Sequence, residues 1–322
     1  MIRDSGRVLE FLDFRGPSAS VQVSNTVSDN NDEPQAELNN FCTRVFAHSA
    51  DLVDWATAPV TFLRTKESTL ENTFDRTGIL LAIGELHFLI TAEHNIEELI
   101  HAGYVPCVAA ARPDVPVTPI LCNKFYVSHE PLTDMAVFRL ETDAVRQILL
   151  GDYRFLRLDR VRIAPPSPKE GPFFLVTGFP TGSVDRDEVN RERANIARLL
   201  TVPFKGTNEE IEHFVPESHI VLEYDANARH TSGNAIPPPK APGLSGCGIW
   251  YLPTPFGMHG WSRRDIHLVG VQTAWHRSRG YLKGTIIAHA LAMIWGWFSD
   301  SRDAMRINGL EYRRGRMRLI RP

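Results

Sequence analysis

The chain has 322 residues, of which 43% are hydrophobic and 23% are charged, close to the averages for soluble globular proteins. This length allows one large domain or two ordinary ones around a substantial apolar core. The formal net charge of -3 gives no general attraction to nucleic acid or to anionic membranes, so we expect neither class of partner.

No secretion signal is predicted, because the first residues, MIRDSGRVLEFLDFRG, are charged throughout and contain no long apolar stretch. The most apolar run, residues 285–298, is too short to span a bilayer. Cys42, Cys107, Cys122 and Cys247 show neither CxxC pairing nor zinc spacing, which favours a reducing compartment, although Cys107 and Cys122 could meet across neighbouring strands. We therefore expect a cytoplasmic protein without a membrane span or a metal site.

Residues 1–55 differ from the rest of the chain. Positions 21–40 are polar, acidic and poor in apolar residues, which predicts a partly flexible N-terminal extension. From about residue 56, short apolar runs between glycines and prolines predict β-strands, beginning with a hairpin at 77–91 around Gly84 and Glu85. Further strands are predicted at 105–110, 124–129, 135–140, 173–179, 219–226, 248–252 and 266–275.

Two segments break this pattern. Residues 185–200 (DRDEVNRERANIARLL) have helical composition and predict a helical insertion, and residues 284–298 predict a C-terminal helix. The chain then ends in an arginine-rich tail, residues 299–322, expected to be a solvated or loosely docked end. The many short strands nevertheless predict an all-β fold, a barrel or a sandwich.

Ser245 lies in a glycine-rich string, PGLSGCGIW at 242–250. Glycine permits backbone angles that push a hydroxyl outward and turn peptide N–H groups toward one point. Such N–H groups stabilise the oxyanion of an acyl-transfer reaction. Glycine-rich turns that contain a serine are common, however, so this string alone does not identify a nucleophile.

His94 and Asp134 are ordinary when each is taken alone. His94 follows an apolar strand (ITAEHN), where it could act as a base in a cleft or simply cap a loop. Asp134 precedes a strand that should be buried (TDMAVFRL), where aspartate is usually a turn residue. The three residues occur in the order histidine, aspartate, serine, and taken together they indicate more than each does alone.

The strings TAEH, TDMAVFRL and GLSGCG resemble, one by one, the three active-site motifs of the trypsin-like (chymotrypsin-fold) serine peptidases. Residues 268–275 (LVGVQTAW) are similar to the strand that lines the substrate cleft in that family, and residues 280–282 before a helix match its ending. The resemblance covers about residues 56–298. It implies two six-stranded antiparallel β-barrels, about 56–145 and 165–280, with the active site between them and a C-terminal helix at 284–298.

The resemblance also implies roles for single residues. His94 would be the general base, Asp134 its orienting carboxylate and Ser245 the nucleophile, while the backbone N–H groups of Gly243 and Ser245 would bind the oxyanion. Thr273 falls where the family places a hydroxyl near the catalytic aspartate. This chemistry requires no metal and no organic cofactor, and its substrate is a protein or peptide.

Departures from the family pattern concern specificity and activation. Pro239 stands where a carboxylate would select arginine or lysine before the scissile bond, and Trp275 falls at the mouth of the same pocket. We therefore expect a smaller or uncharged residue there. Leu244 replaces the acidic residue that zymogen-type members pair with a new N-terminus, so that mode of activation is not expected.

Alternative functions remain open at this stage. A catalytically silent relative could act as a protein-binding module. A lipid or thioester hydrolase would favour the order Ser-Asp-His at a nucleophile elbow, which this chain lacks. A nucleic-acid-binding function rests only on the arginine-rich tail, which could instead contact an acidic protein partner. Cys247 lies past the turn and is expected to be a small buried residue. The resemblance favours a serine endopeptidase with an intracellular regulatory or effector role.

Overall fold

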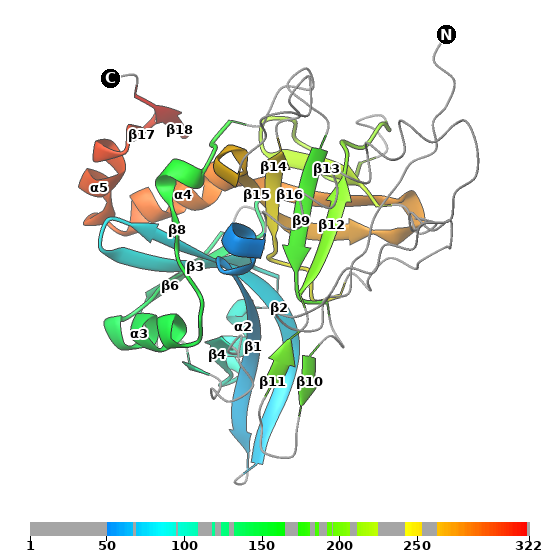
Figure 1. The fold of residues 1–322 in the computed structure, drawn as a ribbon, viewed down its shortest axis with the longest axis vertical. Coiled ribbons are helices and arrows are strands. Elements are labelled where there is room, and N and C mark those ends of the chain that lie inside the picture. The colour runs from blue at the N-terminus through cyan, green and yellow to red at the C-terminus, as the bar shows by residue number, and fades with distance from the viewer. Residues whose placement is uncertain are drawn as a thin grey trace, which may run out of the picture.

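The computed structural model describes residues 50–66, 69–94, 96–108, 118–119, 124–128, 132–164, 173–180, 184–186, 192–194, 196–206, 211–224, 242–252 and 263–320. Over these ranges the chain folds into two curled β-sheets that lie side by side, with a few helices around them (Figure 1). This arrangement confirms the all-β prediction and is consistent with the double barrel of chymotrypsin-like proteins.

The first sheet contains eight strands in the order β5-β4-β1-β2-β3-β7-β6, with β8 paired to β2. Its strands are β1 (Thr57–Lys66), β2 (Thr69–Ile83), β3 (Leu86–Ala92), β4 (Val105–Val108), β5 (Thr118–Pro119), β6 (Lys124–Val127), β7 (Met135–Arg139) and β8 (Leu156–Arg157). β5 and β8 have two residues each, which leaves the six longer strands that the resemblance implies. The β2–β3 hairpin turns at Gly84, with φ of 61°, as predicted.

The second sheet contains six strands in the order β12-β9-β14-β15-β16-β13, all antiparallel. Its strands are β9 (Phe173–Gly178), β12 (Ala197–Thr201), β13 (His219–Glu223), β14 (Gly248–Leu252), β15 (His267–His276) and β16 (Tyr281–Ile286). Every residue of the central strand β14 is buried, which explains its continuous apolar run. A separate short pair is formed by β10 (Val184–Arg186) and β11 (Glu192–Ala194).

The helix predicted at 185–200 is wrong for the part of this segment that the structure describes. β10 and β11 pair with each other, and β12 pairs with β9 along its whole length. Leu199 and Leu200 are both buried there. Helical composition is a weak preference, and it yields where strand pairing and burial of apolar side chains are available.

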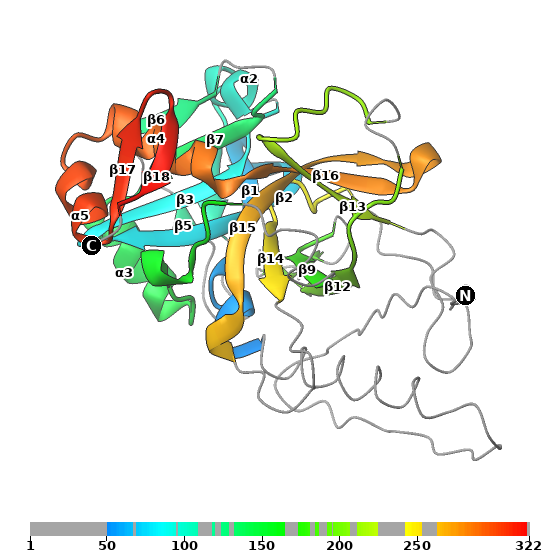
Figure 2. The ribbon, with the colours of Figure 1, turned by 90° about the horizontal axis from the view of Figure 1, so that it is seen from above.

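The helices and helical turns are η1 (Ala50–Asp54), α2 (Ile96–His101), α3 (Thr142–Leu150), η2 (Leu158–Arg160), η4 (Arg263–Asp265), η5 (Arg277–Arg279), α4 (Ile287–Trp297) and α5 (Ser301–Ile307). The predicted C-terminal helix is α4, which begins three residues later than expected because residues 281–286 form β16. α4 packs against β7 of the first sheet and β15 of the second (Figure 2). In the described ranges, no helix is both long and apolar enough to cross a bilayer.

The C-terminal segment is not a loosely docked tail. After α5 the chain forms a hairpin of β17 (Leu310–Arg313) and β18 (Arg316–Leu319). Met305, Leu310 and Met317 are buried in the same apolar cluster as α4. Apolar side chains at these positions hold residues 301–319 on the body of the protein, a signal that the arginine-rich composition hid.

One hydrophobic cluster joins the two sheets. It includes Ile90 of the first sheet, Leu175 and Trp250 of the second, and Ile287 of α4, and each of these side chains has no measurable exposure. Burial of apolar surface on this scale fixes the sheets relative to each other. Loops from both sheets therefore meet in a defined geometry at the boundary between them.

Candidate active site

His94 and Asp134 are brought together by strand pairing. Ala92, the last residue of β3, lies opposite Met135, the first residue of β7, so the residues just beyond these ends share one edge of the sheet. His94 Nδ1 lies 2.9 Å from Asp134 Oδ2 and 3.2 Å from Oδ1, and the His94 N–H donates to Oδ1 at 2.7 Å. An imidazole that donates from Nδ1 leaves Nε2 free to accept a proton.

Asp134 adopts an unusual backbone conformation to make these contacts. Its φ is 43°, in the left-handed region that few residues other than glycine adopt. The Glu93 N–H donates to the Asp134 carbonyl oxygen at 3.2 Å, beside the bonds that the Asp134 carboxylate accepts. Backbone strain of this kind persists only where the surrounding contacts over-determine it.

The turn that carries Ser245 packs directly on β2. Gly243 and Gly246 have φ of 93° and 89°. The Thr77 N–H donates to the Ser245 carbonyl at 3.0 Å, and the Thr77 hydroxyl donates to the Gly243 carbonyl at 2.9 Å while it accepts the Phe179 N–H at 2.8 Å. A Cβ on Gly246 would lie 2.0 Å from the Thr77 carbonyl oxygen. The first sheet thus holds the turn that belongs to the second.

The polar groups of this turn are only partly satisfied. The N–H groups of Gly246 and Cys247 donate to backbone carbonyls at 2.8 and 2.9 Å. The N–H groups of Gly243 and Ser245 donate to no residue that the structure describes. Within the same ranges, the Ser245 hydroxyl makes no hydrogen bond with the His94 imidazole. Catalytic hydrogen bonds often tighten only when substrate is bound.

A pocket of about 270 Å³ lies between the sheets beside His94 and Asp134. Its lining residues are Glu93, His94, Ser128, Leu132 and Asp134 from the first sheet and its loops, and Thr273, Ala274 and Lys283 from β15 and β16. Ser245 is not among them. The Thr273 hydroxyl donates to the Lys283 carbonyl oxygen at 3.5 Å.

Charges of both signs surround the Asp134 carboxylate. Burial raises the pKa of Glu93, and the nearby Asp134 raises it further. Burial lowers the pKa of Arg76, and the nearby Asp134 and Glu93 oppose that shift. Burial also lowers the pKa of Lys283, and Glu212 and Asp134 oppose it. Two cations thus interact with a carboxylate that accepts hydrogen bonds from His94.

Arg76 and Thr77 were missed by the sequence analysis. They lie in β2 and are 4% and 0% exposed. The only sequence signal is a pair of polar residues just before the apolar run GILLAI. Their partners are 14 to 166 residues away along the chain, and no local pattern reveals such contacts.

The remaining expected residues are placed as follows. Trp275 is half-buried and packs edge-on against Tyr224, with ring centroids 5.7 Å apart. Pro239 lies outside the described residues. Cys247 is fully buried, and burial raises the pKa of its thiol well above the usual range. A buried neutral thiol is a poor nucleophile, which agrees with its assignment as a packing residue.

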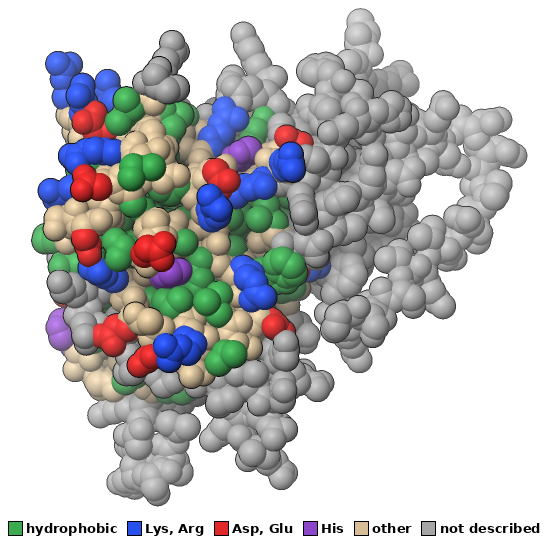
Figure 3. Space-filling view, turned by 60° about the vertical axis from the view of Figure 1, so that its left-hand side comes forward, with side chains coloured by type: hydrophobic (Ala, Val, Ile, Leu, Met, Phe, Trp, Pro, Cys, Tyr) green, Lys and Arg blue, Asp and Glu red, His purple; other side chains and the backbone are tan. Residues whose placement is uncertain are grey.

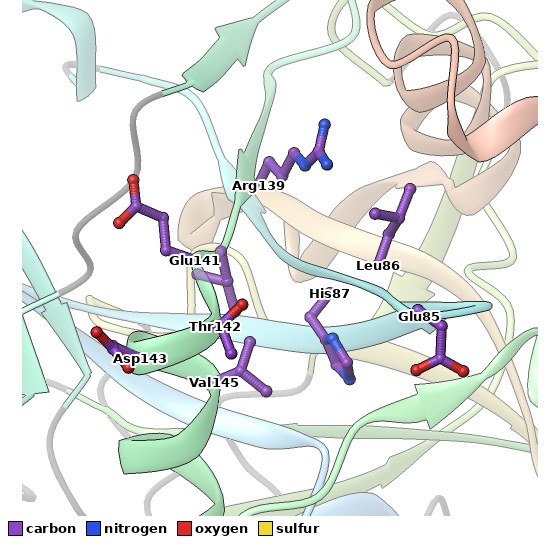
Figure 4. Close-up of a pocket in the computed structure, with 9 residues that line it drawn as sticks. Glu85, Leu86, His87, Arg139, Glu141, Thr142, Asp143 and Val145 are labelled. Carbon is purple, nitrogen blue, oxygen red and sulfur yellow. The ribbon is translucent and has the colours of Figure 1, made fainter.

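A larger cavity of about 830 Å³ lies elsewhere, beside α3 and the β2–β3 turn (Figure 4). Its carboxylates do not converge: Glu141 and Asp143 lie on one side, and Glu85 lies on the other. Arg139, which also lines it, pairs with Asp300 at 2.8 Å. No group of histidines, cysteines and carboxylates suited to hold a metal is found in the described part of the chain. The smaller pocket is therefore the better candidate site.

Comparisons with known proteins add little. No protein-family model and no curated protein sequence matches the chain. A solved structure described as "Structure of Glu endopeptidase in complex with MPD" is similar, with a TM-score of 0.39 and 12% identity over 74% of this chain and 88% of that chain. A similarity this low carries no argument about residues or activity.

Proposed function

We propose that this protein is a serine endopeptidase in which His94 is the general base, Asp134 orients it and Ser245 is the nucleophile. The observation that carries the proposal is the double contact between His94 and Asp134, through Nδ1 at 2.9 Å and through the backbone N–H at 2.7 Å. This contact holds one imidazole tautomer beside a pocket between the two sheets.

The proposed reaction uses protein groups alone. Ser245 Oγ attacks a peptide carbonyl and transfers its proton to His94 Nε2, which returns the proton to the leaving amine. Water then hydrolyses the acyl-enzyme by the reverse route. Asp134 stabilises the imidazolium that forms in each step. The N–H groups of Gly243 and Ser245 would bind the oxyanion, a contribution of about 3 kcal/mol per donor.

The finer parts of the proposal concern substrate and setting. The substrate is a protein or peptide with a small or uncharged residue before the scissile bond, because Pro239 replaces a pocket carboxylate. The role is that of a regulatory or effector protease in the cytoplasm. A purely binding role would require that the His94–Asp134 pair has no catalytic use.

The experiment is a kinetic comparison on a proteome-derived peptide library. Ser245→Ala and His94→Ala should each lower kcat by about a million-fold, and the double variant should be little worse than either one. Ser218→Ala, a serine outside the pocket, serves as the matched control and should keep its activity. Substantial hydrolysis by Ser245→Ala contradicts the proposal, and no cleavage by the unaltered protein favours the binding role.

A further inference from the structure

Arg76 is a buried cation next to the candidate site. It lies in β2 opposite Val60 and is 4% exposed. Its guanidinium reaches the end of β3, where Nη2 donates to the His94 carbonyl oxygen and Nη1 lies 3.5 Å from the Ala92 carbonyl oxygen. A planar fork with several N–H groups suits this contact with two carbonyls, which a single ammonium group reproduces poorly.

Arg76 and Asp134 hold the same stretch of backbone, one through its carbonyl groups and the other through its N–H groups. Asp134 accepts the N–H groups of Glu93 and His94. Arg76 donates to the carbonyls of Ala92 and His94. Both the N–H and the C=O of His94 are therefore fixed by other elements of the first sheet. These bonds together set the direction in which the imidazole leaves the main chain.

Stability alone does not account for a cation at this position. Desolvation of a guanidinium is costly, and an apolar side chain of similar volume is often at least as stabilising. Arg76 Nε is also buried without a hydrogen-bond partner in the described ranges. The attraction of Asp134 and Glu93 offsets part of this cost. The rest of the desolvation cost falls on Arg76, the side chain that donates to the carbonyls of Ala92 and His94.

We propose that Arg76 is a positioning residue that holds the His94 imidazole in register with Asp134 through a two-carbonyl guanidinium fork. The inference rests on the proposed function, which gives His94 its catalytic role. Arg76 lies outside the set of pocket-lining residues, so it acts through His94. Its loss should affect the chemical step while leaving substrate binding intact.

The first readout is kinetic. Arg76→Met should lower kcat by about 100-fold, the effect of misplacing a catalytic group by about 1 Å, with KM nearly unchanged. Arg76→Lys keeps the charge and loses the fork, so it should recover only a small part of the loss. The matched control is Arg198→Met. Arg198 is another buried arginine, 5% exposed, which pairs with Asp54. This variant should lose stability while kcat stays the same.

The second readout does not depend on hydrolysis. In protein labelled with 15N-histidine, the proton between His94 Nδ1 and Asp134 should give a far-downfield resonance, assigned by its absence in His94→Ala. It should persist in Ser245→Ala and in Arg198→Met, and disappear or shift in Arg76→Met and Arg76→Lys. If the unaltered protein hydrolyses nothing, the proposed function fails and this resonance still tests Arg76.

Two results would overturn the inference. One is an Arg76→Met variant that loses stability like Arg198→Met yet keeps both kcat and the His94 resonance. The other is an Arg76→Lys variant with full activity and an unchanged resonance, which would show that charge alone suffices. Should Arg76→Met fail to fold, Arg76→Lys and Arg76→Gln supply the same two readouts.

Discussion

At the scale of single residues, Gly246 ties the nucleophile turn to the first sheet. Its φ is 89°, and a Cβ would lie 2.0 Å from the Thr77 carbonyl oxygen and 2.1 Å from the Thr91 hydroxyl. Gly246→Ala should therefore push the Ser245 turn away from β2, lower activity, and reduce the free energy of unfolding by about 3 kcal/mol. Urea unfolding and peptide hydrolysis measure the two effects.

Gly315 provides the matched control. Its φ is 78°, but a Cβ there would meet nothing within 4 Å. Gly315→Ala should cost about 1 kcal/mol through backbone strain alone and leave hydrolysis unchanged. Equal losses of stability in the two variants would show that the contact with β2 does not constrain the turn.

His219 predicts how stability depends on pH. It is 4% exposed, its Nε2 lies 2.7 Å from the Leu132 carbonyl oxygen, and the Val215 N–H donates to Nδ1 at 2.9 Å, so the ring is held neutral. Burial lowers the pKa of His219; the hydrogen bond to Leu132 opposes this shift, and Lys283 and His289 add to it. Above about pH 6.5 the ring is neutral in both states and has no effect; below it, the unfolded chain binds a proton that the folded protein resists. Stability should fall as the pH drops below that point.

The measurement is the free energy of unfolding at pH 7.5 and at pH 5.5. His219→Gln should have a lower free energy of unfolding than the unaltered protein at pH 7.5. Its free energy of unfolding should fall less between pH 7.5 and pH 5.5. Burial also lowers the pKa values of His87 and His276, so these residues reduce stability on acidification equally in both proteins. The difference between the two proteins therefore isolates His219, and equal losses on acidification would contradict this account.

Some residues of the candidate site were predicted from sequence motifs, and others are recognised only from their contacts in the folded protein. The sequence strings identified His94 and Asp134 as a pair, and strand register explains why they meet. Arg76 and Thr77 could not be found in this way, because their contacts join distant parts of the chain. Thr273 was expected near the catalytic carboxylate, and it lines the same pocket as Asp134, while its hydroxyl donates to the Lys283 carbonyl of β16.

At the scale of elements, short apolar runs were a better guide than composition. The β2–β3 hairpin was predicted from two apolar runs around Gly84, and β14 from a short apolar run that begins at Gly248 and ends before Pro253. The segment that contains β12 was misread as helical because its arginines and glutamates are good helix formers. Its residues pair with β9 residues that lie 19 to 27 positions earlier, and such pairing leaves no local signal.

The C-terminal elements lead to a prediction about stability. Truncation after Asp300 removes Met305, Leu310 and Met317, which are all buried. Each should contribute about 1.5–3 kcal/mol, so the truncated protein should be strongly destabilised at every salt concentration. Thermal unfolding at low and high salt measures this. A loss that vanishes at high salt would point instead to a charge-based docking.

The arginines of this segment are a separate matter. Its three carboxylates are all paired: Asp300 with Arg139, Asp303 with Arg306 and Glu311 with Arg313. In Figure 3, Lys and Arg side chains on this side lie among carboxylates and apolar groups. Arg314, Arg316 and Arg318 form no ion pair with a residue that the structure describes, so an acidic protein partner at the hairpin stays a proposal.

At the scale of the whole molecule, Leu244 bears on how activity would be controlled. It is 2% exposed and lies in the apolar cluster of the second sheet, where an inserted ammonium group would have no carboxylate to meet. Deleting residues 1–40 should therefore leave hydrolysis unchanged or raise it. Chains that begin at several positions between 41 and 49, ahead of η1 with its buried Val53 and the Asp54 that pairs with Arg198, should behave alike. Activity at a single start, lost when that amine is acetylated, would show zymogen-like activation.

In the proposed function, Ser245 is a nucleophile activated by His94. A fluorophosphonate probe reacts covalently with such a serine, and mass spectrometry of the digested protein locates the adduct. The unaltered 322-residue chain should carry one adduct, on Ser245, with almost none in His94→Ala and the normal amount in Ser218→Ala. An adduct on another residue, labelling of Ser245 that ignores the loss of His94, or no labelling of the folded protein would contradict it.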